Sequence, residues 1–143
     1  MPRIEIEFPK LIVLVIDDQD YVRSIIVQLL KRLGVGRVLE CSNGAEALGL
    51  LEQNKPDLIL CDIKMAPVDG LQFLRDVRGG LGGNDPDVPI IFLTSASDRG
   101  TVQAAIESEV DGYLVKPVSA DDLKSKISTV LNRRFVAKGQ HWG

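Results

Sequence analysis

The stretch LIVLVIDDQDYVRSII, residues 11–26, joins an apolar strand to an amphipathic helix. Residues 11–16 are all aliphatic, and from Val22 to Leu33 apolar residues recur at the spacing of one helix face. Between the two segments lie Asp17 and Asp18, adjacent carboxylates that repel each other unless a cation is close. The stretch therefore predicts a strand, a polar loop and a helix, with a charged site where the strand ends.

The same alternation continues along the chain. Apolar runs of strand length occur at 11–16, 37–41, 57–61, 89–93 and 112–115, and helical patterns follow the first run and occupy 44–54, 70–78, 98–108 and 119–132. Repeated strand–helix units predict a parallel sheet with helices on both faces. The central runs are apolar at nearly every position, which is typical of strands covered on both sides. We therefore expect a three-layer, doubly wound α/β fold with five strands.

The length of 143 residues favours one domain. We assign it to residues 10–132, with an N-terminal extension at 1–9 and a C-terminal tail at 133–143. The stretch GGLGGNDPDVP, residues 79–89, is typical of a flexible loop between the third helix and the fourth strand.

Composition argues against several classes of function. A net charge of −3 and a pI near 5.2 give no general reason to bind nucleic acid. No apolar run reaches the roughly 20 residues of a membrane span, and the N-terminus does not resemble a signal peptide, so we expect a cytoplasmic protein with no membrane contact. Cys41 and Cys61 lack zinc-site spacing and are expected to be structural, and His141 has no catalytic companions nearby.

Polar side chains follow four of the five predicted strands. Asp17 and Asp18 follow the first, Asp62 the third, Thr94 the fourth and Lys116 the fifth. Ligands bind open parallel sheets at the carboxyl ends of the strands, so these side chains share one crevice if their strands are neighbours. Crowded carboxylates require a cation, and oxygen ligands with open positions suit Mg²⁺, which commonly bridges carboxylates to phosphate.

The segments VIDDQD, DLILCDIKMAPVDG, IIFLTS and GYLVKP occur in order, each at a strand end. Together they resemble the receiver domain of two-component response regulators, in particular the single-domain, chemotaxis-regulator type. The resemblance covers residues from about 10 to 132. It implies the strand order 2-1-3-4-5, which places the four functional strand ends side by side.

The resemblance also implies a role for each acidic residue. Asp62 is the implied phosphoacceptor, attacking a phosphohistidine on a histidine kinase or phosphotransfer protein. Asp18, Asp62 and the main-chain carbonyl of Lys64 are the implied direct ligands of Mg²⁺, and Asp17 assists through water. Such a protein is not an ordinary enzyme, although it assists its own phosphorylation and dephosphorylation.

Lys116 is expected to pair with phosphoryl oxygens, and Thr94 to hydrogen-bond the phosphoryl group. Movement of Thr94 then lets Tyr113, at the switch-aromatic position, turn inward and repack the surface formed by helix 4, strand 5 and helix 5. We expect a downstream protein to bind there. Kinase specificity is expected on the exposed side of the first helix, which includes Gln19, Arg23 and Gln28.

The sequence departs from the family pattern in two places that matter here. Ala66 separates Met65 from Pro67, where the family usually has Met-Pro, which implies an altered turn beside the phosphoacceptor. Glu109 stands where a glycine commonly ends the fourth helix, so that helix end is expected to fray or close differently.

Several alternatives remain open at this point. Asp17, Asp18 or Asp20 could cap the first helix, Lys116 could be solvated, and Tyr113 could belong to the core. A Mg²⁺-dependent phosphohydrolase with an aspartate nucleophile is a second function, although those enzymes carry DxD where this chain has Asp17-Asp18-Gln19. A docking module with a vestigial site is a third, and the chain could also be excised from a larger protein.

Overall fold

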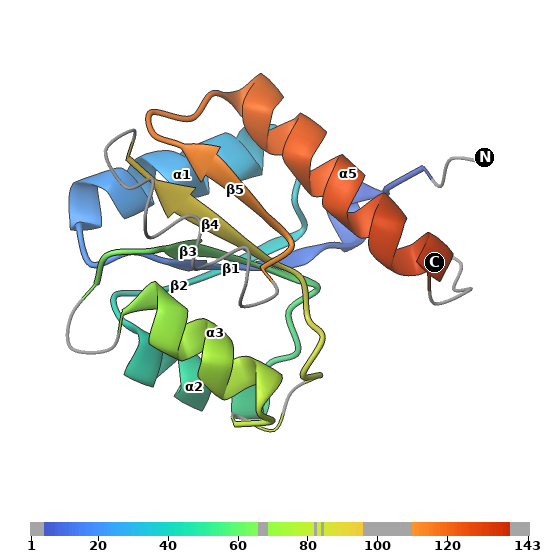
Figure 1. Ribbon diagram of the computed structural model, residues 1–143. Coiled ribbons are helices and arrows are strands. Elements are labelled where there is room, and N and C mark those ends of the chain that lie inside the picture. The colour runs from blue at the N-terminus through green and yellow to red at the C-terminus, as the bar shows by residue number, and fades with distance from the viewer. Residues whose placement is uncertain (1–4, 66–68, 82, 84, 96–109, 138–143) are drawn as a thin grey trace.

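The computed structural model describes residues 5–65, 69–81, 83, 85–95 and 110–137. Five parallel strands form one sheet in the order β2-β1-β3-β4-β5 (Figure 1). The strands are β1 (Ile12–Ile16), β2 (Arg37–Cys41), β3 (Leu58–Asp62), β4 (Ile90–Thr94) and β5 (Gly112–Val115). The predicted fold class and strand order are confirmed.

The described helices cover both faces of the sheet. They are α1 (Asp20–Arg32), α2 (Gly44–Gln53), α3 (Gly70–Arg78) and α5 (Ala120–Ala137), and a 3₁₀ turn (Phe8–Lys10) precedes β1. Helices α1 and α5 lie on one face, and α2 and α3 on the other (Figure 1). The helix predicted over 98–108 lies outside the described residues. None of the described helices is long and apolar enough to cross a membrane.

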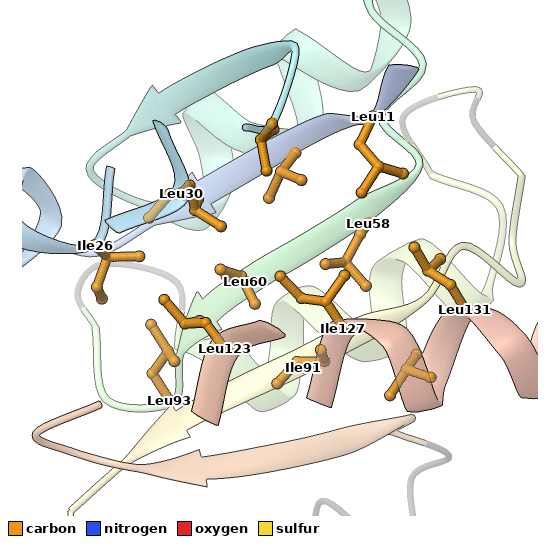
Figure 2. Packing of buried hydrophobic residues seen from close by; sticks show 14 of the residues in the cluster. Leu11, Ile26, Leu30, Leu58, Leu60, Ile91, Leu93, Leu123, Ile127 and Leu131 are labelled. Atoms are coloured by element: carbon orange, nitrogen blue, oxygen red, sulfur yellow. The ribbon is translucent and has the colours of Figure 1, made fainter. Parts of the chain in front are cut away.

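The central strands are buried on both sides, as their continuous apolar runs predict. Every residue of β3 and β4 is buried, whereas the edge strands β2 and β5 are partly exposed. Side chains such as Leu60 and Leu93 pack with Leu30 of α1 and Ile127 of α5, as Figure 2 shows. A second core cluster lies under α2 and α3 and includes Ile59, Phe73 and Phe92.

Helix α5 continues past the predicted boundary. The expectation that it ends at 132, with a tail from Arg133, is wrong because the helix runs to Ala137. Phe135 follows Leu131 by one helical turn, and both are buried in the α1–α5 core cluster. Ile6 and Phe8, from the predicted N-terminal extension, pack against the same cluster.

The second half of the loop at 79–89 is tied to the domain. Arg78 donates hydrogen bonds to the carbonyls of Pro86 and Val88, each at 2.8 Å. Arg134 of α5 bonds to the Asp85 carboxylate and to the carbonyl of Asp87. The loop, predicted to be flexible, is therefore anchored in this part by two arginines.

Both cysteines are buried and unpaired, in agreement with a structural role. Burial raises the pKa of Cys41 to about 12 and raises that of Cys61 well above its ordinary value. Neither thiol is poised to react as a thiolate.

Candidate functional site

Asp17, Asp18 and Asp62 meet at the carboxyl ends of β1 and β3. Each contributes a carboxylate oxygen to a group in which all three lie within 4.8 Å of one another. The proximity follows from the topology, because β1 and β3 are hydrogen-bonded neighbours with Ile16 opposite Cys61. The three acidic residues that the sequence singled out for metal binding are therefore brought together.

Lys116 reaches this group from the loop that follows β5. Its Nζ lies 3.1 Å from Asp17 Oδ2 and 3.4 Å from Asp62 Oδ1. Its main-chain N–H donates to the carbonyl of Thr94 at 2.7 Å, which holds the loop against the end of β4. Lys116 is consequently not a solvated loop lysine, and its charge offsets part of the repulsion among the carboxylates.

Asp17 is fully buried, and both of its carboxylate oxygens are engaged. Oδ1 accepts the Gln19 N–H at 2.9 Å, and Oδ2 faces Lys116. The N-cap of α1 is Gln19, which forms no side-chain capping bond. Helix capping therefore does not explain the adjacent aspartates.

Asp62 ends β3 with only 7% of its surface exposed. Burial raises the pKa of its carboxyl group, Lys116 opposes the rise, and Asp17 adds to it; the net direction is upward. A hydrogen bond from the Lys64 main-chain N–H also stabilises the ionised form. In this environment an added cation would favour the ionised carboxylate.

The donor set fits Mg²⁺. Magnesium binds oxygen at about 2.1 Å, so ligands on opposite sides of the ion lie about 4.2 Å apart. Ligands on neighbouring corners of the octahedron lie about 3 Å apart. The three carboxylate oxygens, within 4.8 Å of one another, would therefore draw together around a shared ion. Asp18 is exposed, which leaves the crevice open to solvent and to a phosphate.

Thr94 lies on β4, the strand next to that of Asp62, and Tyr113 lies on β5, the edge strand beyond β4. Thr94, at the end of β4, is 1% exposed, and its Oγ1 donates to the Ser95 carbonyl at 3.1 Å. Tyr113 pairs with Phe92 in the β4–β5 register and is 41% exposed, so it is not an ordinary core residue. Its side chain is outward, the starting position that the switch hypothesis requires.

Helix α3 begins against the main chain of the site. Gly70 N–H donates to the Ile63 carbonyl at 3.0 Å, and a Cβ at Gly70 would lie 2.8 Å from the Asp62 carbonyl oxygen. Asp69 caps the helix by accepting the Gln72 N–H. This approach positions α3 beside Asp62. The predicted departures from the family pattern at Ala66, Pro67 and Glu109 lie outside the described residues.

The sequence placed Arg23 on the exposed side of α1, and this expectation is wrong. Its side chain is only 15% exposed and folds over the β1–α1 loop, whereas Gln19 and Gln28 are exposed. Burial lowers the pKa of Arg23, but hydrogen bonds to Asp20 and Glu40 outweigh it and raise the pKa overall. Arg23 follows Gln19 by four residues, about one helical turn, and this spacing gave no indication that its side chain reaches the Asp17 carbonyl.

The family model described as the response regulator receiver domain matches residues 13–128. This chain belongs to that family. The receiver domain is 36% identical over 119 residues to the "Chemotaxis protein CheY homolog" of Campylobacter jejuni, covering 82% of this chain and 90% of that protein. It is 37% identical over 121 residues to the "Probable transcriptional regulator ycf27" of Guillardia theta, covering 85% of this chain and 45% of that protein.

A solved structure of similar fold is the receiver domain of a sensor histidine kinase from Pseudomonas aeruginosa PAO1, with a magnesium ion coordinated in its active site cleft. The match has a TM-score of 0.74 and 26% identity, covering 85% of this receiver domain and 97% of that chain. The receiver domain spans about half the length of the transcriptional regulators that it matches.

Proposed function

We propose that this receiver domain accepts a phosphoryl group on Asp62 from a histidine kinase or a phosphotransfer protein, in a Mg²⁺-dependent reaction. The observation that carries the proposal is the group of three carboxylates within 4.8 Å, with Lys116 against two of them. Metal, nucleophile and a cation for the phosphoryl oxygens are the groups that phosphoryl transfer uses.

The metal site would use Asp18, Asp62 and the main-chain carbonyl of Lys64 as direct ligands. Asp17 would act through water, because its two oxygens already bind the Gln19 N–H and Lys116. Bound Mg²⁺ supplies positive charge that draws phosphoryl oxygens into the crevice and stabilises charge during transfer. The magnesium ion seen in the P. aeruginosa receiver supports this assignment.

In the transfer step, an Asp62 carboxylate oxygen forms a bond to phosphorus while the phosphorus–nitrogen bond of the phosphohistidine breaks. The electron pair of the broken bond stays on the imidazole nitrogen. Asp62 would need no general base, because an ionised carboxylate has no proton to remove. Lys116 would bind a phosphoryl oxygen, and Thr94 would donate its hydroxyl hydrogen to another. A related attack by water would release the phosphate.

The downstream partner would bind the surface that β5 and α5 share with the helix expected from the sequence over 98–108, which lies outside the described residues. On β5, Tyr113 and Val115 are 41% and 47% exposed, an apolar pair on one side of an edge strand. Phosphate-induced movement of Thr94 would shift the balance between outward and inward Tyr113. We expect the partner to be a protein in the cytoplasm. Some relatives are named as transcriptional regulators.

Phosphorylation with a small donor tests the proposal directly. Incubation with Mg²⁺ and acetyl phosphate should add the mass of one phosphoryl group, measured by intact-protein mass spectrometry. Asp62→Asn should abolish the labelling, whereas Asp121→Asn, which removes an exposed carboxylate from α5, should leave it unchanged.

Two outcomes would favour the other functions. Steady turnover of phosphate esters, measured as released inorganic phosphate, would indicate the phosphohydrolase. Absence of labelling in the unmodified protein, with partner binding equal to that of Asp62→Asn, would indicate a docking module with a vestigial site.

A further inference from the structure

Arg23 makes three hydrogen bonds to three different segments beside the carboxylates. Nη1 donates to the main-chain carbonyl of Asp17 at 2.7 Å, and Nη2 to Asp20 Oδ1 at 2.7 Å. Nε donates to Glu40 Oε1, on β2, at 3.1 Å. One guanidinium therefore joins the β1–α1 loop, the first turn of α1 and an edge strand.

The two acidic partners of Arg23 are solvated. The side chains of Asp20 and Glu40 are 87% and 49% exposed, and ion pairs of this kind contribute little to stability. Their geometric effect is larger, because a planar guanidinium held at two nitrogens has its remaining donors directed along fixed lines. Here a remaining donor points at the Asp17 carbonyl.

The Asp17 carbonyl belongs to the peptide plane that leads into Asp18. Rotation of that plane moves the Asp18 backbone and redirects its carboxylate. The preceding atoms are fixed, since Asp17 N–H donates to the Cys41 carbonyl at 3.2 Å and the Asp17 carboxylate binds Lys116. Arg23 fixes the carbonyl side, and its own N–H bonds to the Gln19 carbonyl at 2.9 Å.

We propose that Arg23 is a positioning residue for Mg²⁺, orienting the Asp17–Asp18 peptide so that the Asp18 carboxylate faces Asp62. Arg23 touches neither the metal nor the phosphoryl group. The inference deepens the proposed function and rests on it. It also replaces the expectation that Arg23 contributes to kinase specificity from an exposed surface.

Metal affinity measured without any phosphodonor tests the inference. In Mg²⁺ titrations followed by calorimetry or amide NMR shifts, Arg23→Gln should bind Mg²⁺ about tenfold more weakly, since groups that orient metal ligands commonly have effects of that order. Arg23→Lys, which keeps the charge but loses the fork, should lie between Arg23→Gln and the unmodified protein. Arg32→Gln, which changes an exposed arginine of the same helix, should leave the affinity unchanged.

Labelling kinetics give an independent readout. With acetyl phosphate, Arg23→Gln should reach the maximal rate of the unmodified protein at saturating Mg²⁺, but require about tenfold more Mg²⁺ for half of it. A general structural role would instead lower the thermal unfolding midpoint in metal-free buffer and leave the Mg²⁺ requirement unchanged.

A Mg²⁺ affinity within twofold of the unmodified protein in folded Arg23→Gln would overturn the inference. If Arg23→Gln does not fold, the same criterion passes to Arg23→Lys. Failure of the unmodified protein to bind Mg²⁺ would instead reject the proposed function, so the two failures are distinguishable.

Discussion

The two ends of the parallel sheet place buried and half-buried aspartates in contrasting surroundings. At the carboxyl edge, where the strands end, Asp17 and Asp62 face each other across Lys116. At the amino edge, where the strands begin, two half-buried carboxylates each accept a main-chain N–H: Asp57 from Ile12 and Asp111 from Ile90, both at 2.8 Å.

The amino edge also has an arginine fixed into its network. Arg78 Nη2 lies 2.8 Å from Asp111 Oδ2, and the same guanidinium binds the carbonyls of Pro86 and Val88. Burial raises the pKa of Asp57, Asp62 and Asp111 alike, so burial alone does not distinguish the two edges.

The two edges of the sheet differ in the groups that bind their carboxylates. Protein donors surround the carboxylates of the amino edge, whereas the carboxyl edge gathers three acids around a lysine and suits an added cation. We therefore expect the amino edge to contribute to stability, and the carboxyl edge to have a stability cost that binding of a cation would offset.

Removing Arg78 should have the largest effect on stability. Arg78→Ala removes the ion-pair partner of Asp111, which keeps only the Ile90 N–H among the donors that the structure describes, and it removes the Arg78 donors from two loop carbonyls. The Arg78 side chain is 14% exposed. We expect the free energy of unfolding to fall by about 3 kcal/mol, as when one partner of a largely buried pair is removed. Urea denaturation measures the change, and Arg75→Ala, an exposed arginine on the same helix, is the control. Equal losses in the two variants would remove the contrast between the edges.

Neutralising Asp62 should change the free energy of unfolding by less than Arg78→Ala does, and in the opposite direction. Because the folded-state pKa is raised, ionised Asp62 opposes folding, and its stability cost grows as pH rises from the ordinary value of 3.8 through the raised pKa. Asp62→Asn should therefore raise the free energy of unfolding by about 1 kcal/mol at neutral pH without Mg²⁺.

This gain should shrink on acidification and vanish below about pH 3.8, where the carboxyl group is protonated in both states. It should also shrink on addition of Mg²⁺, which would stabilise only the unmodified protein. Thermal unfolding across pH measures both changes. Destabilisation by Asp62→Asn in metal-free buffer at neutral pH would show that the carboxyl edge is not strained.

Replacing Arg134, which also lies at the amino edge, should have the smallest effect on the free energy of unfolding. Its partner Asp85 has a side chain that is 37% exposed, so solvent screens the pair. Arg134→Gln should lower the free energy of unfolding by about 0.5 kcal/mol in urea denaturation. A loss as large as that of Arg78→Ala would mean that anchoring the loop through α5 matters as much as the interior network.

Sequence alone predicted what depends on local pattern and on the order of elements. The strand runs and three of the four described helices, α1, α2 and α3, follow from periodicity. The crevice formed by Asp17, Asp62 and Lys116 follows from the rule for strand ends, together with the strand order that the family resemblance implies. Contacts between distant residues were not visible, because one sequence does not show which side chains meet across the fold.

Two particular residues illustrate that limit. Arg23 has the spacing of a surface residue, and nothing local indicates that its guanidinium reaches the Asp17 carbonyl and Glu40. Phe135 packs into the core cluster that includes residues of α1, and this contact favours the extension of α5. The polar residues around Phe135 in the sequence do not indicate the contact.

The buried cysteines make this domain convenient for spectroscopy. Cys41 and Cys61 are the chain's two cysteines, and both have raised pKa values, so thiol-reactive dyes should leave the native protein unlabelled. A cysteine introduced at exposed Tyr21 or Val115 would then carry the fluorophore alone. Such single-site probes would report on α1 and on β5 separately, without first replacing any native thiol.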